Sequence, residues 1–107
     1  FRYGIDIMRE LGVRPDVIRA GAANLFLSPL FRQTLSTLTG ARIELFNTDG
    51  ALGAARGAAL GAGYYKTRGE AFAALRRLEV VEPAEADRET LEEGYRAWVR
   101  EVEKRME

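Results

Sequence analysis

The pattern of apolar and polar positions predicts alternating helices and short strands. Apolar residues recur every three to four positions over residues 1–11 and stop at Gly12, which predicts a helix ending at this glycine. Residues 17–20 form a short β-branched run that suits a buried strand. Ser28 and Pro29 are typical of the N-cap and first turn of a helix, so a helix begins there and continues to the next glycine.

A second strand–helix unit follows directly. Residues 41–46 alternate as a strand does, 47–50 form a turn and helix cap, and 51–63 form a helix rich in glycine and alanine. Two successive units with short joints predict a parallel α/β sheet with right-handed crossovers, its short strands flanked by helices. Residues 70–77 then predict a short helix, and 78–82 either an edge strand or a simple strap.

The last segment predicts an amphipathic helix. Thr90 and Glu93 are spaced as a capping box at its start. Six apolar residues fall on one face: Leu91, Tyr95, Trp98, Val99, Val102 and Met106. An aromatic stripe at helical spacing is typical of core packing, so we expect Trp98 and Tyr95 to be buried anchors rather than stacking partners for a ligand.

A stripe of glycines runs along the helix over 51–63. Gly53, Gly57 and Gly61 recur every four residues and therefore share one face. Because glycine in a helix costs roughly 0.5–1 kcal/mol relative to alanine, the stripe favours a close approach by another backbone or a ligand. A membrane helix is excluded by the short apolar run and by Arg56 in its middle. We expect the helix to pack tightly against the sheet.

Composition narrows the chemistry. The 107 residues have a net charge of zero and contain neither cysteine nor histidine, which excludes thiolate sites, histidine triads and histidine-based zinc sites. Lysine and arginine are not clustered among aromatic residues, so we expect no nucleic-acid partner. No spanning or signal segment is present, so no membrane partner is expected. The lack of cysteine favours a reducing, cytoplasmic compartment.

The first helix has an apolar stripe that already runs at the first residue, without an initiator methionine or a cap. We therefore expect residues 1–107 to be one partial domain, a C-terminal portion of a longer protein. The strands 17–20 and 43–46 would then border an uncovered sheet edge. Since unpaired edges recruit other chains, we expect this fragment to form a homodimer.

The turn after the first strand has the pattern of a phosphate cradle. Gly21, Ala22, Ala23 and Asn24 are small and lie between a strand and a helix that Ser28 caps. In such a joint, free N–H groups and the helix dipole favour an anion. The other interpretation is that small residues serve only to make the turn sharp.

Two motifs resemble the C-terminal end of the FGGY carbohydrate kinases, and within them the xylulokinase type. The family typically carries Gly-Gly-Gly-Ala-x-Ser-Pro-x-Trp-Arg-Gln, then an Ala-x-Gly-Ala-Ala helix ending in Gly-x-Gly. This chain has Ser-Pro-Leu-Phe-Arg-Gln over 28–33 and Ala-Leu-Gly-Ala-Ala-Arg-Gly-Ala-Ala-Leu-Gly-Ala-Gly over 51–63. Family members also end on a proline, a spacer and a helix with spaced aromatics, as here after Pro83. The resemblance covers essentially the whole chain.

The resemblance implies a partial ribonuclease H-like domain of the actin and sugar-kinase type, helix-rich, with ATP bound at the glycine-rich turn. Without a gap, the family's glycines fall on Ala23, Asn24 and Leu25; with a short insertion, residues 20–22 take their place. We prefer the insertion, because only Gly21 has the freedom that a tight turn requires. The cofactor-binding residues that the resemblance implies are Gly21, Ala22, Ala23, Asn24 and Ser28.

The resemblance further implies a C-terminal part of an ATP-dependent kinase that transfers the γ-phosphoryl group to a sugar hydroxyl, with Mg²⁺ bridging the phosphates. The catalytic aspartate and the site for a pentulose such as D-xylulose are expected upstream, so the fragment alone should be inactive. Nothing in these residues identifies the sugar. The alternative is a non-enzymatic α/β interaction module that uses the small-residue helix over 50–63 to bind a partner.

Overall fold

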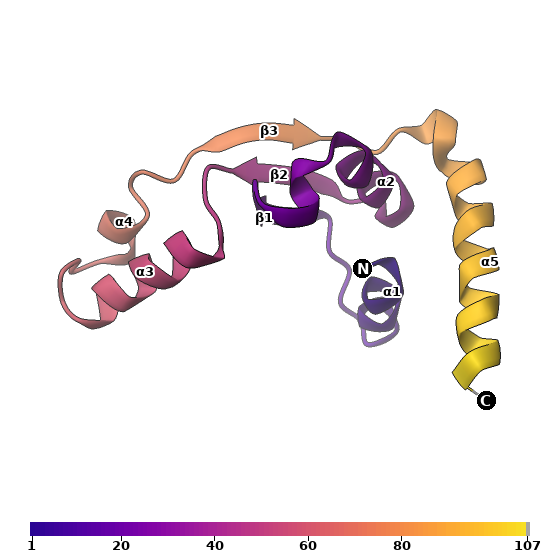
Figure 1. The fold of residues 1–107 in the computed structure, drawn as a ribbon, viewed down its shortest axis with the longest axis horizontal. Coiled ribbons are helices and arrows are strands. Elements are labelled where there is room, and N and C mark those ends of the chain that lie inside the picture. The colour runs from indigo at the N-terminus through magenta and orange to yellow at the C-terminus, as the bar shows by residue number, and fades with distance from the viewer. Residues whose placement is uncertain (107) are drawn as a thin grey trace.

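The computed structural model describes residues 1–106 and forms a small, helix-rich α/β domain with one three-stranded mixed sheet (Figure 1). In chain order the elements are α1 (Arg2–Glu10), β1 (Val17–Gly21), the 3₁₀ helix η1 (Asn24–Leu27), α2 (Pro29–Thr39), β2 (Arg42–Phe46), α3 (Gly50–Gly61), α4 (Arg68–Ala71), β3 (Arg77–Val81), the 3₁₀ helix η2 (Glu85–Asp87) and α5 (Arg88–Met106).

The predicted helix ends are confirmed where a side chain or a glycine specifies them. Ser28 accepts a hydrogen bond from the Phe31 amide at 3.2 Å, with Pro29 in the first turn of α2. Gly40 ends α2 in the left-handed region, and Gly12 follows α1 in the same conformation. Such positions favour glycine because a Cβ is strained there.

The sheet has the order β1-β2-β3, and β1 and β2 are parallel as predicted, with Ile18 opposite Ile43. The predicted parallel arrangement holds for β1 and β2 only, because β3 runs antiparallel to β2 and pairs Val81 with Ile43, which makes the sheet mixed. Residues 77–81 are therefore an edge strand and not a strap. The homodimer expected from open edges stays a prediction.

The core lies between α2 and one face of the sheet. Leu35 from α2 packs with Ile43, Leu45 and Val81, and all four are buried. The polar residues among them are satisfied: the buried Ser36 hydroxyl donates to the Ala41 carbonyl at 2.7 Å. Helix α2 is thus the element that holds the three strands together.

The other face of the sheet carries one buried carboxylate. Glu44, in the central strand, is 4% exposed and accepts hydrogen bonds from Arg19 at 2.9 Å and Arg77 at 3.1 Å. Arg42 lies 3.5 Å from the same carboxylate. Hydrogen bonding to Arg19, followed by that to Arg77, holds the pKa of Glu44 below its ordinary value against the opposing effect of burial.

The glycine-striped helix does not pack against the sheet, which corrects our expectation. Helix α3 has no buried residue, and a Cβ added at Gly53, Gly57 or Gly61 would meet nothing within 4 Å. Figure 1 shows α3 and α4 extending from one end of the sheet while α5 stands at the other end. The radius of gyration is accordingly 17.1 Å, above the roughly 13 Å typical of a compact domain of about 100 residues.

Two further expectations in the second half of the chain are wrong. The helix predicted over 70–77 is shorter and lies earlier, at 68–71. Helix α5 begins at Arg88, directly after η2, so Thr90 lies inside the helix and forms no capping box. Trp98, expected to be buried, is 51% exposed, because α5 meets α1 and α2 along only part of its apolar face.

Candidate functional site

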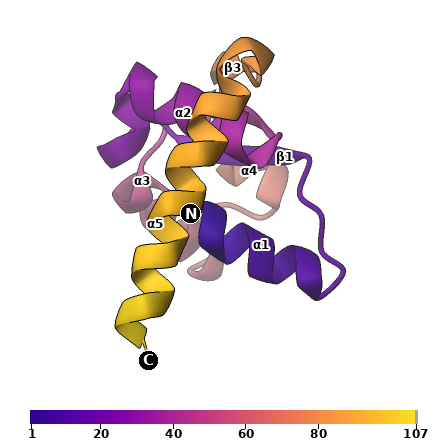
Figure 2. The same ribbon diagram turned by 90° about the vertical axis from the view of Figure 1, so that its right-hand side faces the viewer.

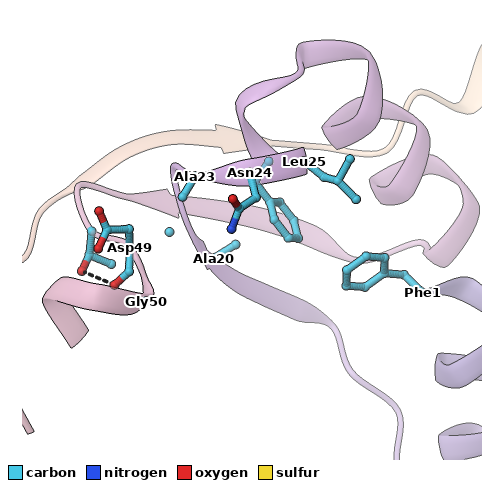
Figure 3. Close-up of a pocket in the computed structure, with 10 residues that line it drawn as sticks. Phe1, Ala20, Ala23, Asn24, Leu25, Asp49 and Gly50 are labelled. Carbon is cyan, nitrogen blue, oxygen red and sulfur yellow. Dashed lines mark hydrogen bonds between the residues drawn. The ribbon is translucent and has the colours of Figure 1, made fainter. Parts of the chain in front are cut away.

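A cavity of about 470 Å³ lies at the carboxyl ends of the two parallel strands (Figure 3). We call it the strand-end cavity, and its lining residues are Phe1, Ala20, Gly21, Ala23, Asn24, Leu25, Phe26, Thr48, Asp49 and Gly50. The joints after β1 and after β2 form opposite walls. Open α/β sheets bind ligands in this position, because adjacent parallel strands place their following loops side by side.

Gly21 is required by the close approach of these two joints. A Cβ at this position would lie 2.5 Å from the carbonyl oxygen of Thr48 and 3.4 Å from the Cα of Asp49. We predicted that Gly21 is needed for its conformational freedom in the turn. That reason is wrong, because the φ angle of Gly21 is not in the left-handed region. Its role is steric: the missing side chain lets the two joints touch.

Asn24 supplies the left-handed residue of the turn. Its φ is 54°, which makes it the only non-glycine residue with positive φ within residues 1–106. Asparagine tolerates this conformation better than other residues with side chains. Its amide lies between Ala20 and Ala23 in Figure 3, and no described residue forms a hydrogen bond with it. An amide group in this position can both donate and accept.

The opposite wall is the N-terminus of α3. Asp49 caps this helix, accepting from the Leu52 amide at 2.8 Å. Arg56, about two turns after Asp49, donates to the Thr48 hydroxyl at 2.9 Å and forms no ion pair with any residue from 1 to 106. One carboxylate and one guanidinium therefore flank a helix N-terminus, whose dipole favours a negatively charged ligand.

The structure brings together only part of the predicted site. Gly21, Ala23 and Asn24 line the strand-end cavity, but Ala22 and Ser28 do not. The reason is η1, which separates the turn from α2, so that Ser28 caps its helix away from the cavity.

Sequence reasoning placed no site residue in the second joint. Thr48, Asp49 and Gly50 line the cavity as closely as the first turn does. The turn-and-cap pattern over 47–50 was visible in the sequence and occupies the equivalent place after the second parallel strand. This pattern could therefore have been used to predict that Thr48, Asp49 and Gly50 line the cavity.

The residues present fit a magnesium–nucleotide complex in a restricted way. Within residues 1–106, no group of three or more acidic side chains is placed to hold a metal ion. Among the residues that line the cavity, Asp49 carries the one carboxylate. Mg²⁺ commonly binds through one or two carboxylates together with substrate phosphates and water. The cavity therefore suits a cation that arrives with its phosphates, and does not suit a fully protein-ligated one.

None of the helices formed by residues 2–106 has the length and apolarity needed to cross a bilayer. No protein-family model matches the chain, and no curated protein matches it at a significant level.

Proposed function

We propose that this chain is the C-terminal, nucleotide-side part of an FGGY-type carbohydrate kinase, with a partial ribonuclease H-like domain and xylulokinase as its nearest functional type. The observation that supports this most is the strand-end cavity, in which the turn predicted from the family motif faces the N-terminus of α3. In the proposal, this cavity receives the phosphates and part of the nucleoside of ATP.

Each wall has a role in binding. The unbonded amide of Asn24 would hydrogen-bond to a phosphate or ribose oxygen, and the first N–H groups of α3 would face the polyphosphate. Asp49 would hold Mg²⁺ together with the phosphates, and Arg56 would balance the added negative charge. The Mg²⁺–ATP complex supplies the phosphoryl group; the base and the pentulose site belong to a separate part of the enzyme.

The test is a titration of the chain with MgATP, followed by amide chemical shifts in nuclear magnetic resonance. We expect saturable shifts at Asn24 and Gly50, and background turnover with D-xylulose. Asn24→Asp keeps the left-handed turn but adds a carboxylate beside the phosphates, and should weaken binding by about tenfold. Thr90→Asp adds the same charge on exposed α5 and should leave the Kd unchanged. Absence of binding, or an equal effect of both variants, would refute the nucleotide assignment.

A second function is favoured by the open face of α3. The glycine stripe of α3 is open: a Cβ added at Gly53, Gly57 or Gly61 would meet nothing within 4 Å. An interaction module that packs a partner helix closely against α3 would require such an open stripe. Gly57→Leu distinguishes the two proposals: in a kinase part it should leave MgATP binding unaltered and should not lower the melting temperature, because the new side chain enters open space on α3. In a module, MgATP would not bind, and the substitution would abolish any association seen by sedimentation of the unmodified chain.

A further inference from the structure

Helix α5 crosses α2 and passes beside α1 (Figure 2). Residues of these three helices line a second cavity of about 300 Å³. We call it the aromatic cavity. Its lining includes Tyr3 from α1, Phe31, Thr34 and Leu38 from α2, and Tyr95 and Trp98 from α5. Its volume is at the lower end of the range of ligand pockets, which is about 300–1,000 Å³, and its lining is mostly apolar and aromatic.

The aromatic rings are arranged around one half-exposed indole. Trp98 is 51% exposed although it lies among other rings: Tyr3 meets it edge-on at 5.8 Å between centroids, and Tyr95 is stacked at 6.0 Å. A large aromatic residue held by two neighbours but left open on the remaining side has surface to bury. A flat ring inserted beside it would complete a set of edge-on and stacked contacts.

The polar side of the cavity carries a network of ion pairs and hydrogen bonds around Arg2 and Tyr95. The Tyr95 hydroxyl donates to Asp6 at 2.9 Å, and the Arg2 guanidinium lies 4.4 Å from the centre of the Tyr95 ring while donating to Glu92 at 2.6 Å. Arg9 also pairs with Asp6, at 3.2 Å. Two guanidiniums thus offset two carboxylates within this network, and the contacts with Asp6 and Arg2 hold the Tyr95 ring in place.

One polar group in the wall has no partner. Thr34 is one of the lining residues, and its hydroxyl forms no hydrogen bond with any residue in the described part of the chain. A hydroxyl can donate to, or accept from, a single heteroatom of a bound molecule. Binding sites commonly combine an apolar lining with a small number of such groups that set the ligand's orientation.

We infer that the aromatic cavity binds an uncharged, planar aromatic molecule of one or two rings carrying a hydrogen-bonding heteroatom. Planarity follows from the stacked and edge-on geometry around Trp98, and neutrality from the balanced pairs beside Tyr95. The size follows from the cavity volume. The mostly apolar and aromatic lining favours such a neutral ligand over a nucleotide, whose binding we propose at the strand-end cavity.

The chain contains a single tryptophan, so the fluorescence of Trp98 reports directly on the cavity. The probe is benzimidazole, which is planar and neutral at pH 7, with excitation at a wavelength that neither tyrosine nor the probe absorbs. We expect saturable quenching or a shift of the emission, together with a shift of the indole N–H resonance. Cyclohexanol, similar in size but not planar, should bind about tenfold more weakly.

Tyr3→Ala removes one ring from the wall and should weaken benzimidazole binding by about tenfold. Tyr64→Ala is the matched control, because Tyr64 is 79% exposed in a loop outside the cavity. The proposal is overturned if benzimidazole does not saturate, or if cyclohexanol binds equally well. These two measurements use the unmodified chain and hold even if Tyr3→Ala does not fold. A blue shift of Trp98 emission with protein concentration alone would overturn it too, since a second copy would then fill the cavity.

Discussion

The same substitution, glycine to alanine, should have opposite effects at Gly21 and Gly57. At Gly21 the new methyl group meets backbone atoms of the neighbouring joint, with the Thr48 carbonyl oxygen 2.5 Å away and its carbonyl carbon 3.1 Å away. Backbone in a joint between a strand and a helix cannot rotate aside as a flexible side chain does. At Gly57 the methyl group enters open space on α3.

The expected magnitudes follow from these two environments. Overpacking by one methyl group costs typically 1–3 kcal/mol, and a contact at 2.5 Å places Gly21→Ala in the upper half of that range. Gly57→Ala removes a flexible residue from a helix interior and should raise the free energy of unfolding by roughly 0.5–1 kcal/mol. For a domain of this size, about 1 kcal/mol corresponds to a change of about 4–8 °C in melting temperature.

The assay is urea unfolding of both variants followed by circular dichroism, with thermal melts as a second measurement. Gly21→Ala should lower the midpoint and Gly57→Ala should raise it, with equal slopes. Gly21→Ala should also weaken MgATP binding, because the joints after β1 and β2 must move apart. A stable Gly21→Ala variant would show that the two joints do not touch, and the geometry of the strand-end cavity would be refuted.

Two further predictions concern titration. Burial, followed by the hydrogen bond to Asp6, raises the pKa of Tyr95 from its ordinary value of 10.0 to about 12. The neutral phenol therefore stabilises the folded state fully below pH 10.0, and this contribution is lost as the pH rises from 10.0 through 12. Ultraviolet titration should show a phenolate step near 12 that is missing in Tyr95→Phe; if Tyr95→Phe instead removes absorbance change near the ordinary value of 10.0, the prediction is contradicted. The hydrogen bond to Arg19 lowers the pKa of Glu44 from its ordinary value of 4.5. The ionised carboxylate therefore contributes fully to the stability of the fold above pH 4.5, and this contribution is lost as the pH falls below that value. Melting temperatures should therefore fall with acidification more steeply in the unmodified chain than in Glu44→Gln, and equal slopes would contradict this.

Local chemistry was sufficient to predict most of the secondary structure. The Ser28–Pro29 start of α2, its glycine end and the Asp49 cap of α3 each depend on groups within a few residues, so the sequence carries them directly. The parallel pairing of β1 with β2 followed from two short strand–helix units in succession. The first wall of the strand-end cavity, at Gly21, Ala23 and Asn24, could be predicted because these small residues lie between a strand and a capped helix.

Tertiary structure decided the remaining features. The direction of the chain after Asp49 determines whether the sheet covers the glycine stripe of α3. In this structure α3 extends away from the sheet, so the stripe stays open. The exposure of Trp98 likewise depends on how far α5 overlaps α1 and α2, a quantity that helical periodicity does not contain. The second wall of the strand-end cavity exists because β1 and β2 lie side by side, which brings Thr48 against Gly21. Periodicity determines which residues share a face, but only the packed chain determines what that face meets.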